Sequence, residues 1–394
     1  MRGRKVVAVT LVTLAACSGT ALAIELNPLE SLGKKIFFDR GLSSPPGQAC
    51  AACHAPQVGF TGPKPGINKR LAVYPGAIHR RFGNRKPPAA AYAGDSPPFS
   101  LDPATGLFSG GMFWDGRATG EVTGDPLADQ AMGPFLNPVE QNMADMAAVC
   151  EEIAASSYAG LFEQVWGDGA LDCGAARVEE TYRNIARSIA AYERSAEVNP
   201  FSSKFDAYLE GKVRLSREEE WGMELFNGKA QCAACHPAPL FTDFTYDNLG
   251  VPRNPDNPFY RMDSVYLDDG TPINPLGEDW VDPGLGGFLA TRPEYAALAA
   301  ENLGKHKVPT LRNVALAPGR GFTKAYMHNG VFKSLEEVVH FYNTRDVAAW
   351  PPPEVAVNVN VDELGDLGLT AREEKALVAF LATLSDGYTA PKRR

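Results

Sequence analysis

One pentapeptide that occurs twice constrains the fold of this chain more than any other feature. Residues 50–54 read Cys-Ala-Ala-Cys-His, and residues 232–236 repeat the same five letters. In a C-x-x-C-H motif the two thiols attach a c-type haem, and the adjacent histidine becomes a ligand of its iron. Four of the seven cysteines of the chain belong to these two copies. The repeat therefore predicts two covalently bound haem c groups, held by Cys50, Cys53, His54, Cys232, Cys235 and His236.

Amphipathic segments flank each motif. Apolar side chains at helical spacing predict helices over residues 28–39 and 217–226, before the two motifs. The same spacing predicts closing helices over residues 176–198 and 370–385, the second with Thr370 as the N-cap of a capping box. A helix, a haem motif, long loops and a closing helix together describe a small c-type cytochrome domain, and this order occurs twice.

These repeats predict a mainly α fold with two c-type cytochrome domains, each with one covalently attached haem, joined by a short linker. The expected organisation is an export signal over residues 1–23, an N-terminal haem domain over 24–198, a linker over 199–216 and a C-terminal haem domain over 217–394. Residues 251–310, rich in proline, aspartate and glycine, are expected to form a long excursion within the second domain.

The N-terminus has the pattern of an export signal. Basic residues precede a short apolar run over residues 6–16, and residues 21–23 read Ala-Leu-Ala, a small-residue cleavage site. The run is too short to span a bilayer. We expect cleavage before Ile24 and export to the periplasm. Haem c is also attached in that compartment. The alternative is a lipobox ending at Cys17, whose lipidation would anchor the protein to the membrane.

The net charge and the remaining cysteines bear on the binding partners and on the redox environment of the protein. A formal net charge of −9 argues against nucleic acid as a partner and permits docking of a basic electron donor. Apart from Cys17, the cysteines outside the haem motifs are Cys150 and Cys173. In an oxidising compartment they either pair as a disulfide or stay as two free buried thiols.

Five further blocks of sequence resemble the bacterial di-haem cytochrome c peroxidase and MauG family. They read FWDGRA at 113–118, QAMGPFLNPVE at 130–140, VPTLRN at 308–313, YMHNG at 326–330 and LEEVV at 335–339. With the two haem motifs, the resemblance covers essentially the whole mature chain. It implies one peroxidatic haem in the N-terminal domain and one electron-transfer haem in the C-terminal domain.

The N-terminal haem pocket is expected to hold the catalytic residues. Cleavage of peroxide at haem needs a group that moves a proton between the two oxygens, and a carboxyl in a haem pocket can have a pKa near neutrality. The resemblance gives this role to Glu140 and assigns Gln130 and Pro134 to the same side of the haem. The alternative for Glu140 is a solvated loop acid. An apparent extra segment over residues 120–125 leaves the local loop geometry open.

Trp114 would lie between the two haems in the family pattern. An indole can relay an electron across a gap that is long for one tunnelling step. A packing role for Trp114 is equally compatible with the sequence.

The sixth ligand of the C-terminal haem divides the family. Peroxidases carry methionine a few residues after the 335–339 block, and MauG carries tyrosine. Alignment on that block assigns the position to Tyr342, whose oxygen would stabilise oxidised iron. Met327 is the competing ligand, although methionine is more often a packing residue. His328 matches a family position near the inter-haem region.

Two other polar residues bear on activation and on calcium. In members that need reductive activation, a loop histidine caps the N-terminal iron, and His79 is the candidate here, with a surface role as the alternative. The family's inter-domain calcium uses an asparagine that aligns with Lys86, and a protonated lysine cannot ligate calcium. Calcium is therefore disfavoured, and the lysine would act as a fixed cation in its stead. His306 and His340 are expected at the surface.

Three functions follow from these residues. The first is a peroxidase that reduces hydrogen peroxide with electrons from a small cytochrome c or cupredoxin. The second is a MauG-like enzyme that oxidises residues of a partner protein; Tyr342 favours it, whereas Ala230, at the position of MauG's exit tryptophan, weakens it. The third is a non-enzymatic electron-transfer cytochrome, which an intact catalytic pocket argues against. Whether the protein is a homodimer is left open.

Overall fold

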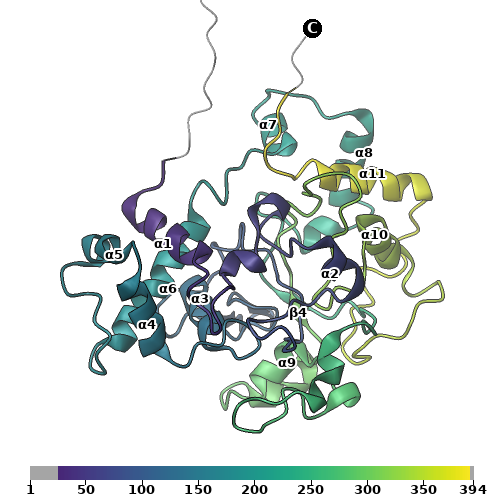
Figure 1. The fold of residues 1–394 in the computed structure, drawn as a ribbon. Helices are drawn as coiled ribbons and strands as arrows, with labels where there is room; N and C mark the ends of the chain where they lie inside the picture. The colour runs from purple at the N-terminus through teal and green to yellow at the C-terminus, as the bar shows by residue number, and fades with distance from the viewer. Residues whose placement is uncertain (1–24, 391–394) are drawn as a thin grey trace, which may run out of the picture.

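Helices joined by long loops make up most of the molecule (Figure 1). The computed structural model describes residues 25–390, so the predicted export signal and Cys17 lie outside the described residues. The α-helices are α1 (Pro28–Phe38), α2 (Pro65–Arg70), α3 (Pro126–Leu136), α4 (Met146–Ala155), α5 (Ala159–Trp166), α6 (Val178–Arg194), α7 (Lys204–Leu209), α8 (Arg217–Asn227), α9 (Gly284–Leu289), α10 (Leu335–Thr344) and α11 (Ala371–Ala382). Within this range, no helix has both the length and the apolar character needed to cross a bilayer.

Strands are short and few among the described residues. They are β1 (Ser100–Leu101), β2 (Phe108–Ser109), β3 (Tyr246–Asp247) and β4 (His306–Lys307), which form two antiparallel pairs, β1 with β2 and β3 with β4. The prediction of a mainly helical chain agrees with this arrangement.

The helix predicted before the first haem motif packs against the closing helix of the same half. Asn27 caps α1 in a capping box, and the buried face of α1 includes Leu32, Ile36 and Phe37. Helix α6 crosses α1 so closely that a Cβ on Gly33 would lie 1.8 Å from the main-chain oxygen of Ser188. Only glycine permits this approach of two backbones. The first haem motif packs on this helix pair, because its short turn contacts α1.

The second half repeats this construction with α8 and α11. A Cβ on Gly222 of α8 would lie 1.9 Å from the main-chain oxygen of Ala376 on α11. The capping box at Thr370 is present as predicted, because its hydroxyl accepts the N–H of Glu373 and the Glu373 carboxylate accepts the N–H of Thr370. All four predicted helices are therefore confirmed. The largest difference is at the end of α6, which stops at Arg194, four residues before the predicted end at residue 198, with Ser195 as its C-cap.

Two large hydrophobic clusters separate along the chain. The buried members of the first come from residues 32–198, and those of the second from residues 205–384. In Figure 1 the helices α1, α3, α4, α5 and α6 gather on one side, and α7, α8, α10 and α11 on the other. Helix α7 lies within the predicted linker, and its Phe205 packs in the second cluster. The exact domain boundaries stay a prediction.

Two local features of the first half were left open by the sequence. Cys150 on α4 forms a disulfide with Cys173, so the paired alternative is confirmed. The segment over residues 120–125 is a tight loop, because the carboxylate of Asp129 accepts main-chain N–H groups from Gly120, Val122 and Thr123. Asp125 then caps α3, which carries two of the predicted pocket residues.

Candidate functional site

Each C-x-x-C-H motif forms a short 3-10 turn that opens into a cavity. The turn over Cys50–Ala52 lines a cavity of about 180 Å³, here called the N-terminal cavity. The turn over Cys232–Ala234 lines one of about 240 Å³, the C-terminal cavity. A single water needs only about 10–15 Å³ of such space, so neither cavity is a packing defect. Both are large enough for an organic cofactor.

The histidine of each motif is prepared to bind a metal. His54 Nδ1 lies 3.1 Å from the main-chain oxygen of Phe60, and His236 Nδ1 lies 2.8 Å from that of Phe241. A hydrogen on Nδ1 that donates to these carbonyls leaves each Nε2 lone pair free, which is the usual second shell of a ligating histidine. Burial lowers the pKa of His54 to about 4 and also lowers that of His236, so both imidazoles are neutral. The two free thiols beside each histidine complete a donor set that fits haem c.

Three predicted catalytic residues meet in the N-terminal cavity. Gln130 and Pro134 line it from consecutive turns of α3, and Glu140 lines it from the turn that follows this helix. Asn137 organises the turn, because its main-chain oxygen accepts the N–H of Glu140 and its side-chain amide donates to Glu140 Oε2 at 2.9 Å. The carboxyl is therefore held in place rather than free in a loop.

Electrostatics keep the Glu140 carboxyl available for proton transfer. Burial raises its pKa above the usual range, while the nearby Arg117 guanidinium and the Asn137 amide oppose that rise. Arg117 is itself fixed between Asp115, at 2.8 Å, and the ring of Phe113, at 3.8 Å from the centroid. This balance is what a group that both accepts and returns a proton requires.

The two cavities share a wall. Four residues line both of them, namely Lys86, Pro88, Ala89 and Trp114. Trp114 is 9% exposed, and its indole N–H donates to the main-chain oxygen of Lys86 at 2.9 Å. Its ring meets that of His328 edge to face at 6.5 Å between centroids. The indole thus lies in the wall between the two cavities, and its place between two haems stays a prediction.

The C-terminal cavity holds both candidates for a sixth ligand. Tyr342 on α10 and Met327 both line it together with His236, and the Tyr342 hydroxyl lies 3.9 Å from the Met327 sulfur. Burial raises the pKa of Tyr342, so the phenol is neutral until a cation coordinates its oxygen. Geometry alone brings both side chains to the cavity and does not choose between them.

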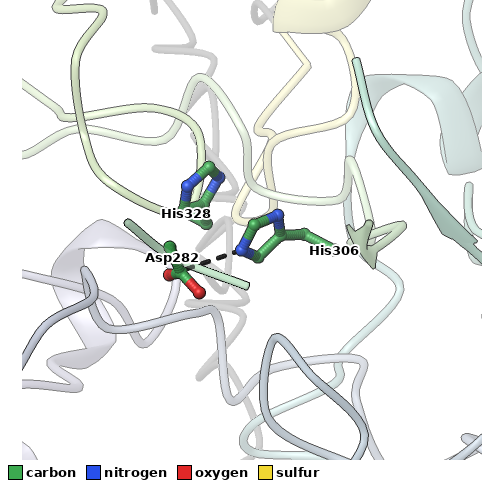
Figure 2. A group of neighbouring side chains, drawn as sticks. All are labelled: Asp282, His306 and His328. Carbon is green, nitrogen blue, oxygen red and sulfur yellow. Dashed lines mark ion pairs between the residues drawn. The ribbon is translucent and has the colours of Figure 1, made fainter. Parts of the chain in front are cut away.

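A histidine pair also lines the C-terminal cavity (Figure 2). The rings of His306 and His328 stack at 3.6 Å between centroids and 7° between planes, and one ligand atom of each lies within 4.8 Å of an Asp282 oxygen. His306 was expected at the surface, and that prediction is wrong: its side chain is 9% exposed because β4 places it beneath His328. His340 is at the surface as predicted.

The stacked pair does not fit a metal ion. An ion bound by both Nε2 atoms would lie far outside both ring planes, whereas an imidazole lone pair lies in its plane. Both oxygens of Asp282 are already bonded to the Arg85 guanidinium, which holds the pKa of Asp282 well below its usual range in spite of burial. We therefore assign these residues to the wall of the C-terminal cavity.

Comparison with known proteins decides the family. The family model described as di-haem cytochrome c peroxidase matches residues 27–214. The methylamine utilization protein MauG of Paracoccus denitrificans is 37% identical over 380 residues, which covers 91% of this chain and 88% of that protein. The chain belongs to the di-haem cytochrome c peroxidase and MauG family. It is therefore an oxidoreductase, and membership implies two haem groups.

Other members of this family are similar along most of their length. The cytochrome-c peroxidase IdrP1 of Denitromonas iodatirespirans is 30% identical over 361 residues, covering 90% of this chain and 81% of that protein. The crystal structure of the diheme peroxidase BthA from Burkholderia thailandensis has a TM-score of 0.75 and 30% identity, covering 93% of this chain and 88% of that one. Peroxidases and MauG proteins are thus both among the relatives.

One predicted site residue lies away from both cavities. His79 is exposed, in a turn between Gly76 and Arg81, and it is not among the described residues that line either cavity. The turn nevertheless touches the catalytic segment, since the N–H of Ala77 donates to the main-chain oxygen of Glu140 at 2.6 Å. A capping role for His79 stays a prediction, as does the expectation that calcium is disfavoured.

Several residues of the site were missed by sequence reasoning. Glu193 lines the N-terminal cavity, and Lys307 and Lys324 line the C-terminal cavity. Their sequence signals are weak, because a glutamate at the end of a helix and lysines between polar loops usually face solvent. Lys86, predicted to be a fixed cation, is partly buried, with its ammonium 5.9 Å from the Trp114 ring centroid.

Proposed function

We propose that this protein is a periplasmic di-haem peroxidase that reduces hydrogen peroxide to water with electrons from a small cytochrome c or cupredoxin. The observation that carries the proposal is the meeting of Gln130, Pro134 and Glu140 in one cavity with His54. A plain electron-transfer cytochrome has no use for a fixed carboxyl beside an open haem face. The presence of peroxidases among relatives of at least 30% identity supports the same choice.

Each cavity would hold one haem, bound by thioethers from its two cysteines and by the histidine of its motif. When bound, the haem iron supplies the redox chemistry that breaks the peroxide O–O bond. We assign residues 24–198 and 217–394 to the two haem domains. The exported form would leave the cytoplasm through the signal over residues 1–23, with lipidation at Cys17 as the alternative.

The polar residues of the N-terminal cavity would act on peroxide. Glu140 accepts a proton from one peroxide oxygen and returns it to the other, which turns the departing oxygen into water. Asn137 keeps the accepting carboxylate oxygen in one place through its 2.9 Å hydrogen bond. Gln130 lines the same space and offers an amide that can orient the peroxide by hydrogen bonding.

Electrons would enter at the C-terminal cavity and leave it through Trp114. The indole occupies the wall that the cavities share, and its N–H is fixed by the Lys86 carbonyl. A fixed aromatic ring at this place divides one long electron transfer into two short ones. The net charge of −9 favours a donor with a basic docking face.

A MauG-like oxidation of a partner protein is the second candidate function. Two observations favour it: the position of Tyr342 in the C-terminal cavity and the 37% identity to MauG. Against it, Ala230 is buried in the wall of that cavity, where the MauG pattern has an exit tryptophan. The tryptophan step of the MauG pattern is therefore missing at this position.

Steady-state kinetics with peroxide and reduced cytochrome c test the proposal. The purified holoprotein is expected to oxidise the donor in proportion to the peroxide consumed, two donors for each peroxide. If the protein reacts with peroxide but oxidises neither a cytochrome c nor a cupredoxin, the peroxidase proposal is wrong. In that case, oxidation of tyrosine or tryptophan in a co-expressed partner protein, followed by mass spectrometry, would support the MauG-like function.

A further inference from the structure

A second carboxyl faces the N-terminal cavity, in addition to Glu140. Glu193 lies in the last turn of α6, its side chain is 4% exposed, and it lines the same cavity. Within residues 25–390, its Oε2 atom has no hydrogen-bond partner. Burial raises the pKa of Glu193 to about 8, so its carboxyl holds a proton at neutral pH. A buried acid with an unsatisfied oxygen costs stability, which points to a role in the chemistry of the cavity.

The other side of Glu193 leads toward solvent. The next residue, Arg194, pairs with Asp125 at 2.6 Å, and both side chains are partly exposed. Asp125 caps α3, the helix that carries Gln130 and Pro134. The charges of Arg194 and Asp125 both act on the Glu193 carboxyl, so this partly exposed ion pair lies near a carboxyl that lines the cavity. A proton from solvent would have a short way to such a carboxyl.

Peroxide reduction needs such a site. Converting one hydrogen peroxide into two waters breaks the O–O bond and consumes two electrons and two protons. The donor protein supplies the electrons, whereas Glu140 only moves a proton that the peroxide already carries. Both protons that appear in the second water must therefore come from outside the cavity.

Building on the proposed peroxidase function, we propose that Glu193 is a second acid of the N-terminal cavity and supplies one of the two protons that the reaction consumes. Its O–H bond breaks as an O–H bond of the second water forms, and the carboxylate is reprotonated from solvent past Arg194 and Asp125. Glu140 and Glu193 would then divide the proton work, one transferring within the peroxide and the other delivering from solvent.

The charged surroundings of Glu193 determine its titration. Arg194 on α6, Asp125 at the start of α3 and Cys50, whose thiol becomes a neutral thioether on haem attachment, act on its charge. Arg117 and Glu140 are the other charged residues named here that line the same cavity. Above its pKa of about 8, Glu193 has no proton to give. We therefore expect kcat to fall as pH rises through about 8.

The substitution Glu193→Gln tests the role, with Glu180→Gln, an exposed glutamate of the same helix, as the matched control. At saturating peroxide and donor, we expect Glu193→Gln to lower kcat by about 10²-fold, a modest effect for an acid catalyst, and to abolish the alkaline fall of the pH profile. The bimolecular reaction of the protein with peroxide, which depends on Glu140, should stay within about twofold of the wild type, far less than removing a general acid would cost. The control should match the wild type in all three measurements.

A readout independent of turnover completes the test. Infrared difference spectra of the holoprotein, recorded as pH is raised through about 8, should contain the carbonyl band of a carboxylic acid that loses its proton. The band should be missing in Glu193→Gln. If that variant loses haem, Glu193→Asp serves instead and should move the alkaline limb without abolishing it. The proposal is wrong if the wild type turns over peroxide and Glu193→Gln has the same kcat and the same alkaline fall of the pH profile. That result would leave the peroxidase function intact.

Discussion

Trp114 donates its indole N–H to the main-chain oxygen of Lys86, with 2.9 Å between the two atoms. The N–H of Lys86 in turn donates to the main-chain oxygen of His328 at 2.8 Å. Lys86 therefore links Trp114 to the segment around His328. The partly buried ammonium of Lys86 lies 5.9 Å from the indole centroid. A positive charge at this distance makes removal of an electron from the ring harder, so Lys86 would tune the proposed relay through both its main chain and its charge.

Replacing Trp114 by phenylalanine should slow electron transfer between the haems. The substitution keeps an aromatic ring in the wall but removes the hydrogen bond to Lys86 and raises the energy needed to oxidise the ring. We expect both haems to stay attached and peroxide still to react, while donor-dependent turnover falls. Stopped-flow spectra that follow the two haems separately after one equivalent of peroxide measure this step. Trp166→Phe, in the first hydrophobic cluster, is the matched control. Unchanged transfer between the haems in Trp114→Phe would reduce Trp114 to a packing residue.

Glu140→Gln should leave the cavity intact and remove its proton-transfer group. The amide is nearly the same size and can still bond Asn137, so we expect normal haem content. General acids and bases contribute about 10²–10⁴-fold, so the rate of reaction with peroxide should fall by roughly that factor. Rapid-mixing measurements against peroxide concentration give this rate. If it stays unchanged, Glu140 has no part in the mechanism, and Glu193 becomes the first acid to examine.

The predicted site residues that the structure brings together are those with a local signature. The C-x-x-C-H motifs need no tertiary information, and the capping box at Thr370 is written in four consecutive residues. Glu140, Gln130 and Pro134 lie within eleven residues, so one helix and one turn are enough to bring them to the same cavity. The Cys150–Cys173 pair was left open because sequence gives no distance between two thiols.

The residues that sequence reasoning missed depend on contacts between distant segments. His306 looked like a surface histidine because the loops on either side of it are polar. Its burial comes from β4 pairing with β3 and from stacking on His328. Glu193 follows an apolar helical face and precedes an arginine, which is also the pattern of a solvated helix end. Only the crossing of α6 over α1 and α3 turns its side chain inward.

Two single substitutions should identify the sixth ligand of the C-terminal haem. If Tyr342 binds the iron, Tyr342→Phe should change the low-spin spectrum of one haem and raise its reduction potential, because an anionic oxygen ligand stabilises oxidised iron. Met327→Leu should then leave both properties nearly unchanged. The opposite pattern would assign the ligand to Met327 and favour the ordinary peroxidase branch. Low-temperature electron paramagnetic resonance and a redox titration of each variant distinguish these outcomes, since the two side chains lie only 3.9 Å apart.

A buried lysine joins the first haem-motif segment to the loops of the second half. The Lys324 ammonium donates to the main-chain oxygens of Val58 at 3.0 Å, Asn313 at 2.8 Å and Leu316 at 3.0 Å. The side chain is buried, and the carbonyls of Val58 and Leu316 depend on it for their hydrogen bonds, whereas that of Asn313 also accepts the N–H of Leu316. One donor thus joins two segments of the chain, residue 58 and residues 313–316.

Replacing Lys324 by methionine should therefore destabilise the protein. Methionine fills similar space but leaves the carbonyls of Val58 and Leu316 without a donor, and each unsatisfied acceptor costs roughly 1–3 kcal/mol. We expect a loss of about 2 kcal/mol or more in the free energy of unfolding, measured by urea titration with the disulfide intact. Lys69→Met, an exposed lysine on α2, should change it by less than about 0.5 kcal/mol. An unchanged urea midpoint in Lys324→Met would mean that the loop oxygens find water or other donors. Because the Lys324 side chain, rather than a bound calcium ion, joins these two segments, a calcium chelator should not lower the midpoint of the wild-type protein.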